Sequence, residues 1–149
     1  MNQSQTNVEQ EQRIIAEFAC EKLVRRFALL NDERDHDGLA SLFVEDGSFS
    51  RPLDPDNPLV GRENIRVAFR DRPPRLSRHV MTNTVIDLVS PIEARGRSYL
   101  IFVSSLDVDS PRPVKAESTL HVGQYDDVFV LTDEGWKFKD RRGSLVLNV

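Results

Sequence analysis

The sequence predicts an α+β fold in which three N-terminal helices pack against a strongly curved, mainly antiparallel β-sheet. In the first half, apolar side chains recur at helical spacing between polar ones. In the second half, runs of β-branched and aromatic residues are separated by turn signals that contain Pro or Gly. Helices followed by strands, rather than helices alternating with strands, are typical of the α+β class. The length of 149 residues fits a single domain, residues 1–149.

Three helices are expected. The longest is expected over residues 8–31, with residues 1–7 frayed in front of it. Its apolar stripe consists of Ile15, Phe18, Ala19, Leu23, Phe27 and Leu30. A second, short helix is expected over residues 37–44. Gly61 begins a third helix, which ends at Pro73 because proline cannot continue the backbone hydrogen bonding.

Most strands are expected in the second half. Five segments are predicted to be strands: residues 48–50, 78–89, 94–108, 114–130 and 136–146. Residues 51–59 contain three prolines, and proline lacks the N–H that a strand needs, so this segment is predicted to be a loop. Four long strands joined by short turns predict an antiparallel meander.

Composition argues against several classes of protein. The net charge of −4 differs from the basic surplus of a general nucleic-acid binder. No apolar run approaches the roughly 20 residues of a membrane helix, and the polar residues 1–12 do not resemble an export signal. The lone Cys20 cannot form an internal disulfide and is expected to be a buried, inert thiol. The predicted location is the cytoplasm, with no membrane and no nucleic-acid partner.

Arginines are concentrated in one segment, residues 62–78. The six are Arg62, Arg66, Arg70, Arg72, Arg75 and Arg78. The first three are four residues apart and share one face of the expected third helix. Such a face is most often solvated, and the alternative is a surface for an acidic partner or an anionic ligand.

Three segments resemble the SnoaL-like branch of the NTF2-like superfamily. They are FALLNDERDHDGLASLFVEDGSF at residues 27–49, RHVMTN at 78–83 and VGQYDDVFVLTDEGWKFKDRR at 122–142. Each motif is degenerate, but their order and spacing are more specific, and the resemblance extends over residues 10–145. It implies a cone-shaped fold in which the sheet curls around the helices and encloses a deep, largely apolar pocket.

Asp32 and His79 are the candidate catalytic pair. Histidine transfers protons near neutral pH, and a carboxylate on its other ring nitrogen fixes the tautomer and stabilises the imidazolium. In family members that are dehydratases or dehydrohalogenases, an Asp at the end of the first helix meets a His at the start of the second strand. The resemblance places these roles on Asp32 and His79. The alternative is that Asp32 caps the helix turn and His79 only bonds a loop.

The resemblance leaves one role unfilled, the group that assists the leaving atom. Family dehydratases often carry a tyrosine or lysine about one turn before the Asp, whereas this chain has Phe27, Ala28 and Leu29 there. The candidate replacements are Tyr99, Tyr125, Arg51 and Arg142. The residues expected to bind substrate are Phe27, Tyr99, His121, Tyr125 and Arg142.

In the last expected strand, successive side chains are expected to point to opposite faces of the sheet. Phe138, Asp140 and Arg142 share one face, and Lys137, Lys139 and Arg141 share the other. An arginine of this strand has two possible roles. Beside a pocket that excludes water it binds a substrate carboxylate or enolate, and the more common alternative is a surface ion pair with Asp126 or Asp127. The three histidines show no metal-binding spacing, and no nucleotide-binding or nucleophile motif is present, so neither a metal nor a cofactor is expected.

Two functions are compatible with the sequence. The first is a cofactor-independent lyase or isomerase, dehydratase-like, that acts on a small hydrophobic polycyclic or aromatic molecule through His–Asp acid–base catalysis. The second is a non-catalytic ligand-binding or assembly protein that resembles the small subunit of ring-hydroxylating dioxygenases. Residues 99–103 are apolar on both faces of their strand, which predicts a homodimer or higher homo-oligomer.

Overall fold

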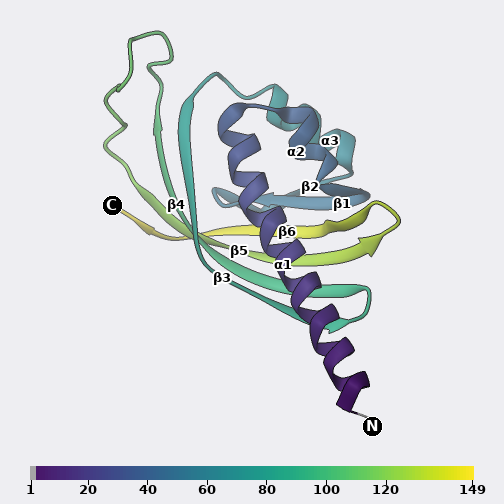
Figure 1. Ribbon diagram of the computed structural model, residues 1–149. Helices are drawn as coiled ribbons and strands as arrows, with labels where there is room; N and C mark the ends of the chain where they lie inside the picture. Colours follow the sequence, from purple (N-terminus) through teal and green to yellow (C-terminus); the bar gives the residue numbers. More distant parts are fainter. Residues whose placement is uncertain (1–2) are drawn as a thin grey trace.

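The computed structural model describes residues 3–149 as helices packed on one face of a curved, open β-sheet (Figure 1). In chain order the elements are α1 (Gln3–Glu33), α2 (His36–Ser41), β1 (Phe43–Arg51), β2 (Asp54–Val60), α3 (Arg62–Arg70), β3 (Leu76–Ser90), β4 (Glu93–Ser105), β5 (His121–Thr132) and β6 (Gly135–Asn148). The α+β class is confirmed.

The six strands form one sheet in the order β2-β1-β6-β5-β4-β3. Only β1 and β6 are parallel; every other neighbouring pair is antiparallel. Register shifts interrupt several of these ladders, among them Thr82/Val85 in β3 and Val128/Phe129 in β5. Bulges of this kind bend a strand and increase its twist, which helps the sheet to curve around α1.

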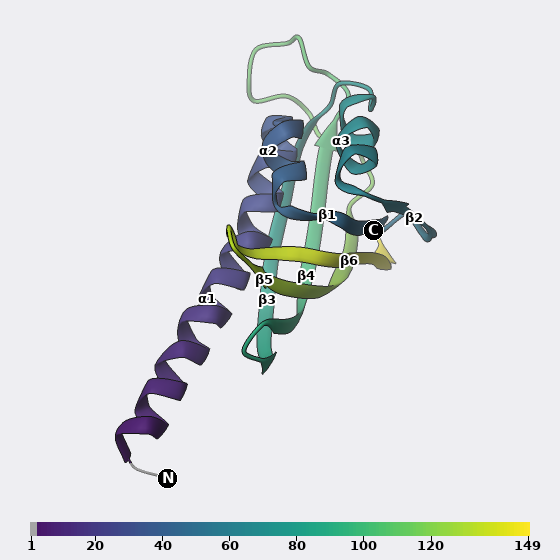
Figure 2. The same cartoon turned by 90° about the vertical axis from the view of Figure 1, so that its right-hand side faces the viewer.

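The helices differ in arrangement from the expectation. One helix is long and two are short, and α3 follows a β1–β2 hairpin where a single short strand and a loop were expected. Residues 3–7, expected to be frayed, form the first turns of α1, while residues 1 and 2 lie outside the described part of the chain. Figure 2 shows that the first half of α1 extends beyond the sheet.

The inward face of α1 is rotated from the predicted apolar stripe. Its buried residues are Ala16, Cys20, Val24, Phe27 and Ala28. Ile15 and Phe18, which were expected to pack inward, are exposed because they lie off the face of α1 that buries Ala16 and Cys20. Cys20 is fully buried as predicted, and burial raises the pKa of its thiol to about 12.

Two strand boundaries also differ. The proline-containing segment predicted to be a loop forms β2, an edge strand that pairs with β1 alone. An edge strand tolerates Pro55 and Pro58 because one side of its backbone needs no ladder partner. The strand expected from residue 114 begins at His121, and residues 106–120 form a loop without a strand or helix.

An aromatic core joins α1 to the sheet. Phe27 lies at its centre and contacts Phe43, Phe49, Phe69 and Phe138 at ring-centroid distances of 5.5–6.1 Å. Aromatic pairs at such separations add to the free energy gained from burial. This core holds α1 against β1, α3 and β6. α1 also packs along β3, where His79 lies. No helix among residues 3–149 is long and apolar enough to cross a membrane.

Candidate active site

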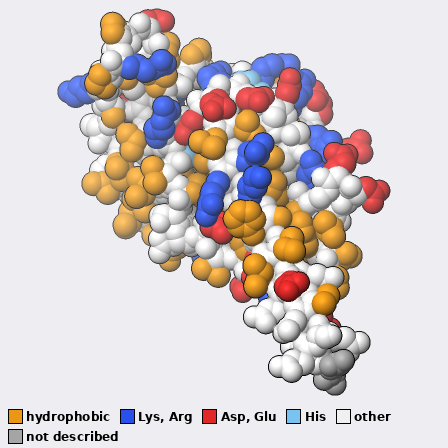
Figure 3. Space-filling view, in the orientation of Figure 1, with side chains coloured by type: hydrophobic (Ala, Val, Ile, Leu, Met, Phe, Trp, Pro, Cys, Tyr) orange, Lys and Arg blue, Asp and Glu red, His pale blue; other side chains and the backbone are white. Residues whose placement is uncertain are grey.

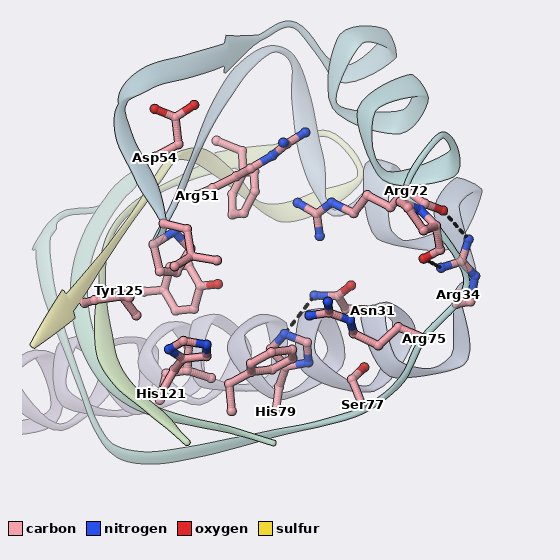
Figure 4. A pocket seen from close by; sticks show the side chains of 17 residues that line it. Asn31, Arg34, Arg51, Asp54, Arg72, Arg75, Ser77, His79, His121 and Tyr125 are labelled. Carbon is pink, nitrogen blue, oxygen red and sulfur yellow. Dashed lines mark hydrogen bonds between the residues drawn. The ribbon is translucent and has the colours of Figure 1, made fainter. Parts of the chain in front are cut away.

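A cavity of about 350 Å³ opens between the end of α1, the loop after α3 and the concave face of the sheet (Figure 4). Its floor is apolar, formed by Phe49, Leu100, Phe102 and Leu145. Its polar lining residues are Asn31, Arg34, Arg51, Asp54, Arg72, Arg75, Ser77, His79, His121 and Tyr125. A small-molecule site usually combines an apolar surface with convergent polar groups, and this cavity has both.

Asp32 and His79 meet at the wall of this cavity. Asp32 lies in the last turn of α1, His79 lies near the start of β3, and His79 Nδ1 is 2.6 Å from Asp32 Oδ1. Only 9% of the Asp32 side chain and 12% of the His79 side chain are exposed. The two residues are 47 positions apart in sequence, so the packing of α1 on β3 brings them together.

The Asp32 carboxylate accepts three hydrogen bonds. Besides the His79 ring, the Ser77 hydroxyl donates to Oδ1 at 2.7 Å and the His79 backbone N–H donates to Oδ2 at 3.0 Å. Burial by itself raises the pKa of Asp32, but the hydrogen bonds from His79 and Ser77 outweigh it and hold this pKa below its ordinary value. Asp32 is therefore ionised at neutral pH.

The hydrogen bonds of His79 determine its tautomer. A carboxylate only accepts, so Nδ1 carries the proton and donates it to Asp32. Nε2 then holds a lone pair, which accepts a hydrogen bond from the Asn31 side-chain amide at 3.2 Å (Figure 4). The Nε2 side of the ring lies at the cavity, and the ring packs on Phe102 at 4.7 Å between centroids. This arrangement has an oriented, unprotonated ring nitrogen beside a pocket, which is what a general base requires.

Three other expected residues line the cavity: Tyr125, His121 and Arg51, the last a candidate replacement for the missing leaving-group helper. Burial raises the pKa of Tyr125, against the opposing effect of nearby Arg141 and Arg72, so its hydroxyl remains protonated. Figure 4 shows that hydroxyl pointing into the cavity. His121 Nδ1 lies 2.9 Å from Asn148 Oδ1 and donates to it, which leaves Nε2 as an acceptor.

Three residues expected to bind substrate do not line the cavity. Phe27 is enclosed by aromatic rings in the core beneath it. Tyr99 lies on the outer face of β4 with 47% of its surface exposed, because Leu100 and Phe102 take the inward positions. Because this strand carries apolar residues on both faces, its sequence shows no alternation of polar and apolar residues that would identify the inward side.

The third, Arg142, is exposed and lies 3.8 Å from Asp56. A bulge explains the difference, since Phe129 pairs with Phe138 but Val128 pairs with Asp140. One extra residue in β6 reverses the alternation and turns Arg141 inward.

Arg141 is fully buried and its Nη1 donates to Asp127 at 2.6 Å. Its guanidinium also lies over the ring of Tyr125 at 3.9 Å. Desolvation raises the pKa of Asp127 to about 7, although Arg141 opposes that rise. This pair lies behind the cavity wall and not in the cavity lining.

Sequence reasoning missed two partners of the pair and the role of three arginines. Asn31 and Ser77 contact His79 or Asp32 directly, and their positions beside Asp32 and His79 in the chain were the available signal. The arginine-rich segment was noticed, but its solvated face was the favoured interpretation. Arg72 and Arg75 from that segment, and Arg34 at the end of α1, line the cavity. Among residues 3–149, no group of three or more His, Cys, Asp or Glu is arranged to hold a metal ion.

Comparison with known proteins places this geometry in a family. A family model for the SnoaL-like domain matches residues 12–142. A candidate scytalone dehydratase from Novosphingobium aromaticivorans is 26% identical to this chain, with a TM-score of 0.73. The match covers 98% of this chain and 90% of the dehydratase chain.

Two further solved structures share the fold at lower identity. A type 2 hexachlorocyclohexane dehydrochlorinase is 18% identical with a TM-score of 0.79, over 94% of this chain and 91% of its own. An NTF2-like protein from Novosphingobium aromaticivorans, described as having a cystatin-like fold, is 18% identical with a TM-score of 0.72, over 95% and 89%. No curated protein sequence matches the chain significantly.

Proposed function

The chain belongs to the SnoaL-like family, and we propose that it is a cofactor-independent lyase or isomerase, dehydratase-like, with His79 as its general base. The observation that carries the proposal is the unprotonated Nε2 of His79 at the cavity, with Nδ1 bonded to ionised Asp32. The neighbour at 26% identity is described as a candidate dehydratase, which is in line with a lyase. A ligand for a cavity of about 350 Å³ is a small, mostly hydrophobic molecule of polycyclic or aromatic type.

The proposed reaction removes a carbon-bound proton. A substrate C–H group displaces the Asn31 amide from Nε2 of His79, and Nε2 takes the proton. The electron pair of the C–H bond forms the new C=C bond, and the neighbouring C–O bond breaks. The imidazolium returns its proton to the departing hydroxide, so water leaves and His79 is regenerated. Asp32 stabilises the imidazolium while it exists, because the carboxylate stays ionised.

Tyr125 is the proposed hydrogen-bond donor to the leaving or carbonyl oxygen. Its hydroxyl is protonated, points into the cavity and lies on the wall opposite Asn31 (Figure 4). His121 adds a second polar position beside Phe102. A donor placed where negative charge develops lowers the barrier without moving during the reaction.

The test begins with a substrate screen. Hydroxylated polycyclic ketones and chlorinated rings are incubated with the protein, and elimination is followed by the absorbance of the new conjugated double bond. His79→Ala is expected to reduce kcat by about 10²-fold or more. His36→Ala, which changes a histidine in α2 outside the cavity, is the control and should retain the wild-type kcat. Equal turnover by the His79→Ala and wild-type proteins would refute the proposal, and ligands that bind without turnover would favour a carrier.

A homodimer is proposed as the assembly state. Val8, Ile14, Ile15 and Phe18 are exposed on the first half of α1. Hydrophobic side chains are visible on the surface of the molecule in Figure 3. Val80 and Tyr99 are exposed on the outer face of the sheet. Exposed apolar patches of this kind mark contact surfaces in soluble proteins. Light scattering is expected to give twice the chain mass of 17.0 kDa, and a monomer mass would contradict the proposal.

A further inference from the structure

The polar groups of the cavity are divided by charge. His79 and His121 lie on one side, and the guanidinium groups of Arg51 and Arg72 reach into the cavity from the opposite side (Figure 4). Four arginines line this cavity against a single carboxylate, Asp54. Asp54 is exposed and accepts a hydrogen bond from Asn57 at 2.6 Å. The proposed catalytic cavity therefore has an excess of positive charge.

The four arginines of the cavity differ in the hydrogen-bond and ion-pair partners of their guanidinium groups. Arg34 donates to the backbone carbonyls of Arg72 and Pro73 at 2.9 and 3.1 Å, and so holds the loop after α3 in place. Arg75 is exposed to solvent. Within residues 3–149, neither Arg51 nor Arg72 has a carboxylate within ion-pair distance. Buried Arg141, by comparison, forms an ion pair with Asp127.

Arg51 and Arg72 are also partly buried. Arg51 Nε is buried and has no hydrogen-bond partner among the described residues. The Arg72 guanidinium lies 3.9 Å from the ring centroid of Phe69. Burial, with the nearby charge of Arg51 second, lowers the pKa of Arg72 to about 10. Two like charges in a poorly solvated place are unfavourable unless an anion joins them.

The backbone brings these two side chains to one place. Arg51 is the last residue of β1, and Arg72 follows α3 by two positions. Pro52 packs on Gly143 of β6, where a Cβ would lie only 2.6 Å from the Pro52 ring. This close approach, which only glycine permits, fixes the chain directly after Arg51. Both guanidinium groups are thus presented by packed backbone and not by a free loop end.

From this arrangement we infer that the ligand carries a carboxylate, bound between Arg51 and Arg72, while its apolar body lies on Phe49, Leu100 and Phe102. The planar guanidinium fork matches a carboxylate with two parallel N–H donors. The inference rests on the proposed function in one respect, since it places the reacting carbon of the bound molecule toward His79. Recognition of the carboxylate itself does not require catalysis.

The experiment measures binding of benzoate, phenylacetate and β-naphthoate, each with its neutral amide, by calorimetry on the whole protein. At least one carboxylate is expected to bind about 10-fold or more tightly than its amide. Arg51→Gln and Arg72→Gln should each remove that preference and leave amide binding unchanged. The control is Arg70→Gln, which removes an equal charge from an exposed ion pair with Asp71 and should keep the preference.

Two readouts separate this inference from the proposed reaction. His79→Ala should bind the carboxylates as the wild type does, even where it abolishes turnover. Thermal unfolding shows that each variant is folded, and Arg72→Gln without ligand should melt at or above the wild-type temperature because it relieves repulsion from Arg51. Three results would overturn the carboxylate site: equal binding of acid and amide, no binding of any carboxylate at millimolar concentration, or an unchanged preference in both arginine variants. None of them bears on the role of His79, which the substrate screen tests separately.

Discussion

Two carboxylates in this molecule contact a basic side chain at the same distance and respond in opposite ways. Asp32 Oδ1 lies 2.6 Å from His79 Nδ1, and Asp127 Oδ2 lies 2.6 Å from Arg141 Nη1. The pKa of Asp32 is below its ordinary value, whereas that of Asp127 is raised to about 7. Distance to the partner therefore does not decide the ionisation of either group.

The difference lies in hydrogen bonding and in access to water. Asp32 lies at a cavity wall, and its two oxygens receive three hydrogen bonds. Asp127 is enclosed in the core, and its Oδ1 has no partner among the described residues. Desolvation is therefore compensated at Asp32 and uncompensated at Asp127. The first pair is suited to proton transfer, and the second is a buried structural contact.

The largest effect is expected from breaking the buried pair. Arg141→Met leaves the Asp127 carboxylate in the core without a counter-charge and should lower the free energy of unfolding by about 3–5 kcal/mol at pH 8. Urea unfolding monitored by circular dichroism measures it. Arg142→Met, one residue along the same strand, removes an exposed arginine and should cost under about 0.5 kcal/mol. Equal losses in the two variants would contradict the contrast drawn between the pairs.

Next in size is the effect of Asp32→Asn on turnover. The amide can no longer stabilise the imidazolium and can present the wrong group to Nδ1, so kcat should fall by about 10²-fold or more. Ligand affinity should change little, because the side chain keeps its shape. Steady-state kinetics on a substrate from the screen provides the measurement. A kcat within a few-fold of wild type would show that the ionised carboxylate is not required.

The two carboxylates should also give stability profiles of opposite slope. For Asp127 the folded pKa of about 7 exceeds the ordinary value of 3.8, so its contribution to stability is lost as pH rises between about 4 and 7. For Asp32 the folded pKa is the lower one, so its contribution is present above 3.8 and is lost as pH falls below it.

Unfolding free energies measured at several pH values test this contrast. The difference between wild type and Asp127→Asn should shrink as pH rises from 4 to 7, and that between wild type and Asp32→Asn should shrink as pH falls below 4. Two differences with the same sign of slope would contradict the opposite pKa shifts.

The smallest effect is expected from Ser77→Ala. It removes one of the three hydrogen bonds to Asp32 while the contacts from His79 remain. The free energy of unfolding should fall by about 1 kcal/mol and kcat by less than about 10-fold. A loss as large as that of Asp32→Asn would mean that the hydroxyl, and not the carboxylate, governs the orientation of His79.

Local sequence patterns predicted much of this molecule. The position of the long helix, the four long C-terminal strands and the α+β class followed from side-chain periodicity and turn residues. The resemblance in motif order selected Asp32 and His79, which lie together in the structure. Such features depend on residues close in the chain, or on a family pattern that already contains the fold.

The remaining features depended on tertiary packing. The bulge in β6 is a property of its pairing with β5, and it placed Arg141 rather than Arg142 inside. The proline-rich β2 is a strand only because β1 offers it an edge. Arg51 and Arg72 are 21 positions apart and meet at one cavity only through the packing of β1 and α3. The sequence by itself determined most of the elements and, through the family resemblance, the Asp32–His79 pair. The tertiary structure decided which side chains face the cavity, because a one-residue change in register reverses every side chain that follows it.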